Sequence, residues 1–271
     1  RIFGAAGEHR WITGAVEHHA GVETRHDRIG AVGLFQTAAR SRLATVRLDR
    51  VQQTSVAAHY QASVPLADWL RVSPGVRADY YRFDVASDDP ANSGVADDAI
   101  VSPKFAAVFG PWARTEFYLN AGRGFHSNDA RGATITRDPK SGLPVGRVDP
   151  LVAATGYELG LRTRPLPGLT STLALFRLDL DSELLFVGDA GATEASRPSR
   201  RVGVEWSSEW RPADWLGAVG SWRASARVEP ADPRVGDPVV FTLRIEGEGN
   251  PTLLPRPSLR KSALGGPFTA S

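Results

Sequence analysis

The histidines are the first candidates for chemistry in this chain, because imidazole binds transition metals and transfers protons near neutral pH. There are six, at His9, His18, His19, His26, His59 and His126. His18 and His19 are adjacent, so in a strand they point to opposite faces and do not share one ion. The sequence contains no HExxH or comparable spacing. We therefore expect neither a metal site nor a bound cofactor.

Two acidic pairs and one serine are the next candidates, the first for calcium binding and the second for nucleophilic catalysis. Asp88–Asp89 and Asp97–Asp98 offer the oxygen ligands that calcium takes, but we place them in a polar loop whose carboxylates face water. Ser127 follows His126, yet neighbours in sequence do not form a catalytic triad, and no GxSxG elbow is present. Gly122–Gly124 lacks the strand–turn–helix context of a phosphate-binding loop. We therefore predict no catalytic residues and no enzyme.

A last group of polar residues stands close together near the middle of the chain. It consists of His126, Asn128, Asp129 and Arg131. Their spacing fits no catalytic motif, so we interpret them as residues that contact a ligand or hold a loop in place. Their role depends on the elements that carry this loop.

The stretch Ser102–Gly132 contains two alternating segments, a short turn and then a long Gly-rich loop. A period of two predicts a β-strand with one apolar and one wet face. Strands of about ten residues with this pattern build membrane-spanning barrels, although the pattern also suits a soluble sandwich. From Trp112 onward one face holds Ala113, Thr115, Phe117, Leu119 and Ala121, and the other holds Arg114, Glu116, Tyr118 and Asn120.

The same alternation recurs along the chain. It is found in Val56–Val64, Leu70–Tyr81, Tyr157–Arg164 and Val202–Arg211. Their second faces carry many polar and charged residues. Such residues are costly in a sandwich core, whereas in a wide barrel they face water. The repetition therefore favours a barrel wall.

The connections between these strands alternate in length, as they do in outer-membrane barrels, where the long loops are extracellular. We predict short turns at Pro65–Asp68, Gly110–Pro111, Pro165–Gly168 and Pro212–Asp214. Long loops are predicted at Asp84–Ala99, Gly124–Pro150 and about Asp181–Ser199. Aromatic residues near the strand ends suit interfacial girdles: Trp69, Trp112, Trp215, Phe83 and Phe125.

The composition of the chain excludes several classes of protein and of binding site. No apolar run of about 18 residues exists, so no transmembrane helix is expected. The chain has no cysteine, which removes disulfides and thiolate sites. Net charge is only +2 and the arginines are scattered, so we expect no nucleic-acid binding. The first residues have no signal-peptide pattern and the sequence lacks Met. We therefore expect this sequence to be a piece of a longer protein.

The residues GRGFHSNDARG at 122–132, with the hairpins around them, resemble the C-terminal β-barrel of TonB-dependent outer-membrane receptors. The resemblance covers about residues 1–216. It implies a barrel of the 22-stranded type in a Gram-negative outer membrane, filled by a plug domain. It also implies that the plug contacts TonB in the periplasm, and that energy from the inner membrane drives uptake of a metal chelate, such as a siderophore, or a similar nutrient.

The sequence departs from this family pattern in three respects. It has no plug-like segment or TonB box, it holds about ten or eleven barrel strands, and it ends in PFTAS without the family's closing aromatic. The predicted fold is therefore all-β: a partial antiparallel transmembrane β-barrel over residues 1–220. Such an open sheet would leave two unpaired edges, which lipid does not tolerate.

Residues 224–259 resemble the start of a BatD-type oxygen-tolerance protein of the periplasm, on VGDPVVFTLRIEGEGN followed by LLPRP. This resemblance implies a short immunoglobulin-like β fragment. We accordingly expect a boundary near residues 217–224 and a second unit over residues 221–271, for which the resemblance implies a periplasmic location. A gene fusion, a frameshift and an assembly chimera all stay open as its origin.

Two alternative functions stay open beside the receptor. One is a soluble envelope β-sandwich or adhesin-type binding module, and the other is a passive porin. For the receptor the expected partners are the outer-membrane lipid bilayer, TonB through a plug domain, and a small-molecule ligand such as a metal chelate. The transported ligand itself is not predicted from the sequence.

Overall fold

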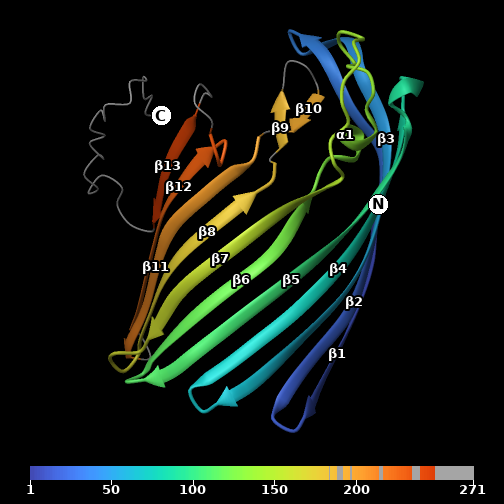
Figure 1. The fold of residues 1–271 in the computed structure, drawn as a ribbon. Helices are drawn as coiled ribbons and strands as arrows, with labels where there is room; N and C mark the ends of the chain where they lie inside the picture. The colour runs from blue at the N-terminus through green and yellow to red at the C-terminus, as the bar shows by residue number, and fades with distance from the viewer. Residues whose placement is uncertain (183, 188–191, 196, 214–215, 234–238, 248–271) are drawn as a thin grey trace.

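The computed structural model describes residues 1–182, 184–187, 192–195, 197–213, 216–233 and 239–247. It contains one antiparallel sheet of 11 strands in the order β1 to β8, β11, β12 and β13, together with a separate β9–β10 hairpin (Figure 1). The all-β prediction and the single antiparallel sheet are therefore confirmed. The strands of the large sheet are β1 (Ile2–Thr13), β2 (Val16–Ala38), β3 (Ser41–Ala67), β4 (Leu70–Ser87), β5 (Gly94–Trp112), β6 (Thr115–Ser127), β7 (Leu151–Thr163), β8 (Leu169–Leu180), β11 (Ser199–Ala213), β12 (Leu216–Glu229) and β13 (Val240–Gly247).

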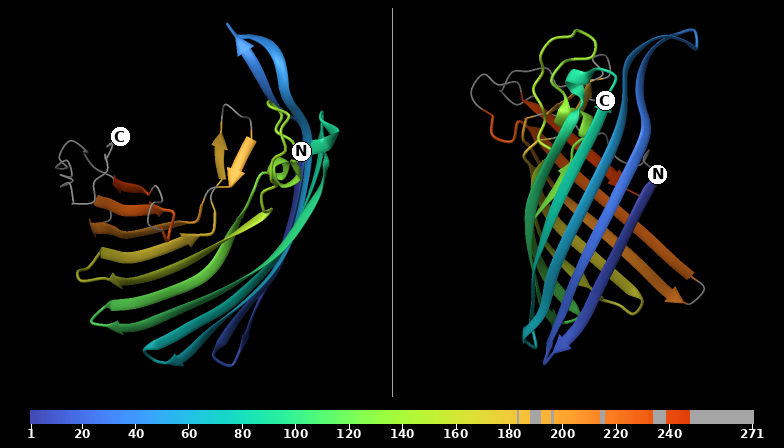
Figure 2. Two further views of the ribbon diagram at one scale, coloured as in Figure 1. Left: turned by 45° about the horizontal axis from the view of Figure 1, so that its top comes forward. Right: turned by 90° about the vertical axis from the view of Figure 1, so that its right-hand side faces the viewer.

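The smaller elements all lie at one end of the sheet (Figure 1). They are β9 (Leu184–Val187), β10 (Ala192–Ala195), the 3-10 turn η1 (Pro90–Asn92) and the helix α1 (Ala130–Thr134). Figure 2 shows that the sheet curves into a trough and that α1 lies on its concave side. Within the part of the chain that the structure describes, no helix is long and apolar enough to cross a membrane.

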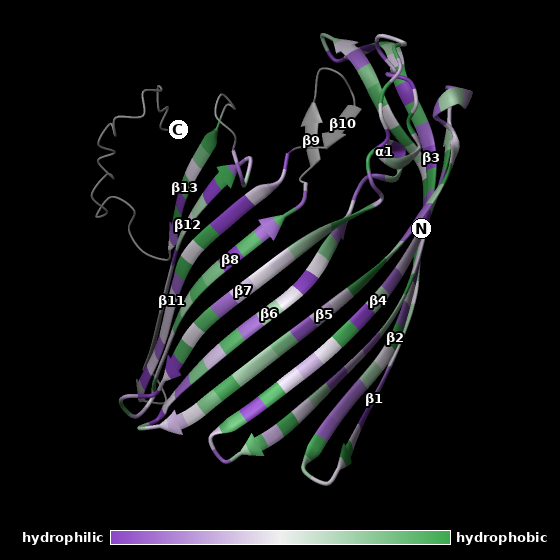
Figure 3. Cartoon of the chain, in the orientation of Figure 1, coloured by the Kyte–Doolittle hydropathy of each residue, from purple (hydrophilic) through white to green (hydrophobic). Residues whose placement is uncertain are grey.

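The convex face of the trough is apolar and exposed. On β6, Phe117 is 43% exposed and Leu119 is 40% exposed, and they lie opposite Leu161 and Leu159 of β7. Figure 3 shows apolar and polar residues alternating along the strands. An apolar surface of this extent is costly in water and favourable in hydrocarbon.

The concave face is lined by ion pairs and hydrogen bonds. Arg77 of β4 bonds Glu23 of β2 at 2.9 Å and Asp79 of its own strand at 3.0 Å. The Asn120 side-chain amide donates to Glu158 at 3.0 Å. The exposed pair between Arg77 and Glu23 contributes at most about 1 kcal/mol. These contacts make the concave face compatible with water, while the backbone hydrogen bonds of the ladders hold the sheet together.

The turn between β5 and β6 lies at Ala113–Arg114, so the predicted turn at Gly110–Pro111 was wrong by three residues. Ala113 and Arg114 have φ of 47° and 64°, as the two central residues of a tight hairpin require. Gly110 also has a positive φ, of 109°. There the β5–β6 register shifts between Phe109 and Trp112, so the glycine forms a bulge inside the hairpin.

The predicted loop Asp84–Ala99 is much shorter than expected. β4 continues to Ser87 and β5 begins at Gly94. Asp97 and Asp98 therefore lie in β5, opposite Arg82 and Tyr81 of β4. The loop prediction gave weight to the polar residues, whereas the ladder between β4 and β5 continues through them up to Val85 opposite Gly94.

The aromatic residues divide into two groups. Trp69 and Trp112 are each 49% exposed, and their rings stack at 6.3 Å beside the short turns, as a girdle would. Phe83 is completely buried, so the girdle prediction was wrong for this residue. Phe125 is partly buried and packs edge-on against Tyr81 at 5.8 Å, and its place in a girdle stays a prediction. Trp215 lies outside the described residues.

The sheet continues through the C-terminal region. β12 pairs with β11 on one side and with β13 on the other, from Trp222 opposite Gly247 to Glu229 opposite Val240. The boundary expected near residues 217–224 falls inside β12. The immunoglobulin-like fragment and the BatD-type resemblance stay predictions, and residues 248–271 lie outside the described residues.

Candidate ligand-binding site on the concave face

The connection between β6 and β7 folds into the trough and rests on its wall. Ala130 of α1 packs into a buried apolar cluster with Val51 of β3 and with Phe83 and Val85 of β4. These side chains form an apolar patch on a face that is otherwise polar. A helix of five residues is not stable alone, so this contact is what fixes α1 in the trough.

The base of the connection is closed by Asn128 and Asp129. The Asn128 backbone N–H donates to Pro150 at 2.9 Å, and its side-chain amide donates to the Asp149 carbonyl at 2.6 Å. The Asp129 carboxylate accepts from the Arg131 backbone N–H at 2.9 Å and from the Arg131 Nη2 at 2.6 Å. Asp129 thereby caps the first turn of α1.

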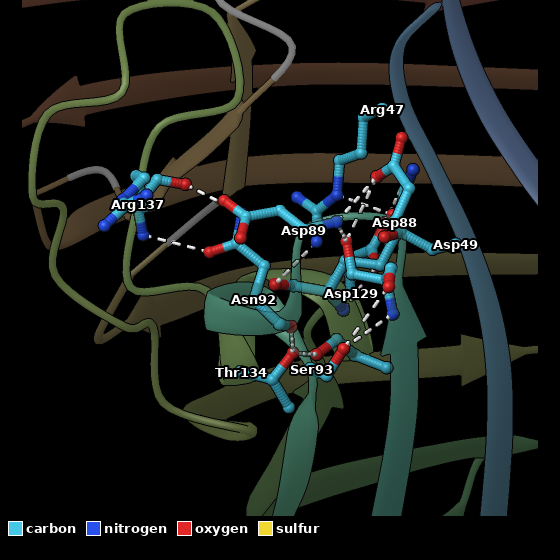
Figure 4. Close-up of polar contacts among 12 residues, drawn as sticks. Arg47, Asp49, Asp88, Asp89, Asn92, Ser93, Asp129, Thr134 and Arg137 are labelled. Atoms are coloured by element: carbon cyan, nitrogen blue, oxygen red, sulfur yellow. Dashed lines mark hydrogen bonds and ion pairs between the residues drawn. The ribbon is translucent and has the colours of Figure 1, made fainter.

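Asn92 of η1 fastens the same connection from the neighbouring loop (Figure 4). Its side chain is completely buried. The amide Nδ2 donates to the Arg137 carbonyl at 2.9 Å, and Oδ1 accepts from the backbone N–H groups of Thr136 and Arg137 at 3.0 and 2.9 Å. Thr134 Oγ1 donates to the Asn92 carbonyl at 3.1 Å. The polar groups of this buried amide are therefore well satisfied.

One charged pair lies beneath α1 and a second forms its first turn, Asp129 with Arg131. Arg47 and Asp49 of β3 are 3% and 1% exposed and form an ion pair of 2.5 Å, and Arg47 donates to the Arg131 carbonyl at 3.4 Å. Burial alone would raise the pKa of Asp129, but hydrogen bonds from Arg131 and its charge outweigh burial and lower that pKa. The hydrogen bond to Asp129 likewise raises the pKa of Arg131. Asp129 and Arg131 are therefore both charged at neutral pH.

Below this connection the concave wall is hollowed. The hollow has a volume of about 690 Å³, within the range of small-molecule sites. Gly122 of β6 and Gly156 of β7 lie opposite each other. Because neither has a side chain, the backbone itself lines the hollow at this point. The flanking residues combine charge, hydrogen-bonding groups and apolar surface: Lys104, Asn120, Glu158, Phe176 and Leu178. An amphipathic ligand could contact all of these groups.

The structure brings together three of the four sequence-predicted site residues. Asn128, Asp129 and Arg131 meet at the base of α1, and their polar groups bond within the loop. His126 lies near the end of β6, opposite Val152, and is partly buried. Sequence reasoning missed Asn92 and Arg47, because nothing in the local pattern reveals partners more than forty residues away.

Most of the remaining histidines bond to neighbouring strands. His18 contacts the Tyr60 hydroxyl at 2.7 Å, His19 lies 3.1 Å from Glu8, and His26 contacts Thr54 at 2.9 Å. Among the described residues, no group of three or more His, Asp or Glu side chains is arranged to hold a metal ion.

Comparison with known proteins gives consistent matches. The family model for the TonB dependent receptor-like beta-barrel matches residues 3–257. Among solved structures, the copper transporter OprC aligns with a TM-score of 0.62 at 13% identity, over 86% of this chain and 38% of that one. The ferric-catecholate import receptor Fiu from E. coli aligns with a TM-score of 0.59 at 13% identity, over 86% and 38%.

The ferric yersiniabactin uptake receptor FyuA from Yersinia pestis aligns with a TM-score of 0.57 at 17% identity, over 84% of this chain and 35% of that one. At these identities the likeness concerns the fold. The chain spans little more than a third of the length of each of these three structures.

Proposed function

This chain belongs to the TonB-dependent receptor β-barrel family, and from that premise we propose that it forms part of the wall of an outer-membrane transporter. The observation that carries the proposal is the two-faced sheet. Its convex side exposes Phe117, Leu119 and Leu159, while its concave side carries Arg77, Glu158 and other charged residues. This arrangement suits a wall between lipid and a water-filled passage.

The proposed cargo is a metal chelate of the siderophore kind or a similar nutrient. The hollow at Gly122 and Gly156 supports this proposal, because it combines Lys104 and Glu158 with the apolar Phe176. Chelates of this kind present charged and apolar surface together. The proteins with similar folds are named for copper transport, ferric-catecholate import and ferric yersiniabactin uptake.

His126, Asn128, Asp129 and Arg131 are proposed to act where the ligand enters. Asn128 and Asp129 hold the β6–β7 connection on the wall, so their part is to fix the shape of the entrance. His126 and Arg131 are partly exposed and are the two that we propose contact ligand. A plug domain that contacts TonB would complete the transporter and couple it to inner-membrane energy.

Uptake of a labelled ferric chelate by cells tests this function. Cells that carry the intact gene should accumulate the chelate, and dissipation of the proton gradient should stop accumulation. Uptake that continues without the gradient would indicate a passive porin instead. A protein that stays soluble and monomeric without detergent would contradict the membrane assignment and favour an envelope binding module.

A further inference from the structure

Two arginines lie side by side at the end of the sheet that carries the short turns. Arg114 stands in the β5–β6 turn, and Arg164 directly follows β7. The Arg164 backbone N–H donates to the Arg114 carbonyl at 3.0 Å, next to the ladder pair of Thr115 and Thr163. Both arginines border a basin of about 340 Å³ and an adjoining basin of about 450 Å³. The backbone therefore holds two guanidinium groups at the same two basins.

The smaller basin opens on the concave face of the sheet. It is also lined by Glu116 and Arg162, which lie opposite each other across the β6–β7 ladder. These two residues share a face with Asn120 and Glu158, because every second residue of a strand lies on the same side. That face is the one we place against the water-filled passage. A solute that leaves the passage between the short turns would therefore come next to the two arginines.

The positive charge of this arginine pair is not balanced by neighbouring residues. Both side chains are exposed, and within the ranges that the structure describes no carboxylate forms an ion pair with either. Glu209, which borders the larger basin, is engaged by Arg211 at 2.6 Å. Glu116 lies opposite Arg162 and offsets at most one further charge. Like charges opposite each other in a ladder repel, so an anion between the two arginines would be stabilising.

The chemistry of the two basins suits an anion that also carries apolar surface. A guanidinium group donates two parallel N–H bonds to one carboxylate or phosphate, so two such groups side by side can bind one anionic group together. The larger basin adds the apolar surface of Leu166, Pro167 and Leu169. Its volume of about 450 Å³ lies within the range of small-molecule sites.

We propose that Arg114 and Arg164 bind an anionic group of the cargo, a carboxylate or a phosphate, as the cargo leaves the passage between the short turns. The inference rests on the proposed function and deepens it, because it makes the cargo a net-anionic solute and adds a contact point away from the hollow at Gly122 and Gly156. A site on the way out must bind weakly enough to let the cargo go. The arginine pair is therefore expected to speed passage and not to set the affinity at the entrance.

The first test measures anion binding by the intact protein in detergent, with inorganic phosphate as the probe and phosphorus NMR line broadening as the readout. The test variant is Arg114→Asn with Arg164→Gln, and asparagine is chosen because it tolerates the positive φ of residue 114. The control is Arg40→Asn with Arg50→Gln, which removes two exposed arginines of the β2–β3 hairpin. Arg40 has a matching φ of 66°. Heat-modifiable migration on a gel shows that each variant is folded.

The affinity for phosphate should fall about tenfold in the test variant, because charge-assisted hydrogen bonds are lost, and it should stay unchanged in the control. Equal broadening in the wild type and the test variant would overturn the proposal. A wild-type protein that binds no phosphate would overturn it as well, and is the result expected if acidic residues of a plug domain already occupied the two arginines.

The second test connects the site with the cargo. Cells that carry the intact gene are given a labelled ferric chelate of net negative charge or one of net positive charge. In the test variant, uptake of the anionic chelate should slow severalfold while its binding to the cell surface and the uptake of the cationic chelate stay unchanged. Unchanged uptake of the anionic chelate would overturn the proposal even if phosphate binding is lost. If wild-type cells take up neither chelate, the proposed function fails, whereas phosphate binding by the arginine pair is judged by the first test.

Discussion

At one end of the sheet, two residues turn β5 into β6, and the aromatic rings of Trp69 and Trp112 stack beside them. At the other end, the connection from β6 to β7 folds back into the trough and is held by Asn92 from a separate loop. The first end is therefore built from local backbone geometry. The second depends on contacts between segments that are far apart in the sequence, and it should be the more sensitive to single substitutions.

The largest expected effect comes from Phe83→Ala. Phe83 is completely buried beneath α1, and its removal would leave a cavity that costs about 3–5 kcal/mol. We expect α1 to leave the wall, with faster amide hydrogen exchange over residues 128–150. Phe117→Ala is the matched control, because Phe117 is 43% exposed on the convex face. Equal exchange in the two variants would contradict the contact.

Removal of the Asn92 amide should have a somewhat smaller effect. Asn92→Ala would leave the Arg137 carbonyl and the N–H groups of Thr136 and Arg137 without their partner, at a cost of about 3 kcal/mol. Protease cleavage within residues 136–150 should become faster. In the control Asn120→Ala, which breaks one exposed bond to Glu158, the cleavage rate should not change.

The β6–β7 connection should also respond to acid. The folded-state pKa of Asp129 lies below its ordinary value of 3.8, so its charge stabilises the loop above that value. This stability is lost as the pH falls through the folded pKa. Hydrogen exchange over residues 128–135 should therefore rise only below about pH 4. Asp129→Asn should remove this response, whereas loosening between pH 5 and 7 would point to another group.

The smallest effect is expected at the tight turns. Ala113 has φ of 47°, a conformation that glycine adopts without a Cβ penalty, so Ala113→Gly should raise stability by up to about 1 kcal/mol. Ala39, in the equivalent turn at the other rim, also has φ of 47° and should respond equally. Urea unfolding of the refolded protein measures both changes, and a loss of stability would contradict the assigned turn geometry.

The sequence predicted the parts of the molecule that are fixed by local pattern. Alternation placed Phe117 and Leu119 on one face and Glu116 and Asn120 on the other, as observed. Phe83 was misassigned to a girdle. Alternation predicts which residues of a strand lie on the same face, but it does not predict that α1 covers that face. Asn92 was missed for a related reason, since its partners at residues 134–137 lie on another loop.

The most direct test of the central claim is cysteine labelling, since the chain has no cysteine of its own. Leu143→Cys places an exposed thiol in the β6–β7 connection, and Asp68→Cys places one in the β3–β4 turn. If the sheet spans the outer membrane, a membrane-impermeant maleimide should label residue 143 on intact cells and residue 68 only after permeabilisation. Labelling of both on intact cells, or recovery of the protein in the soluble fraction, would contradict the claim.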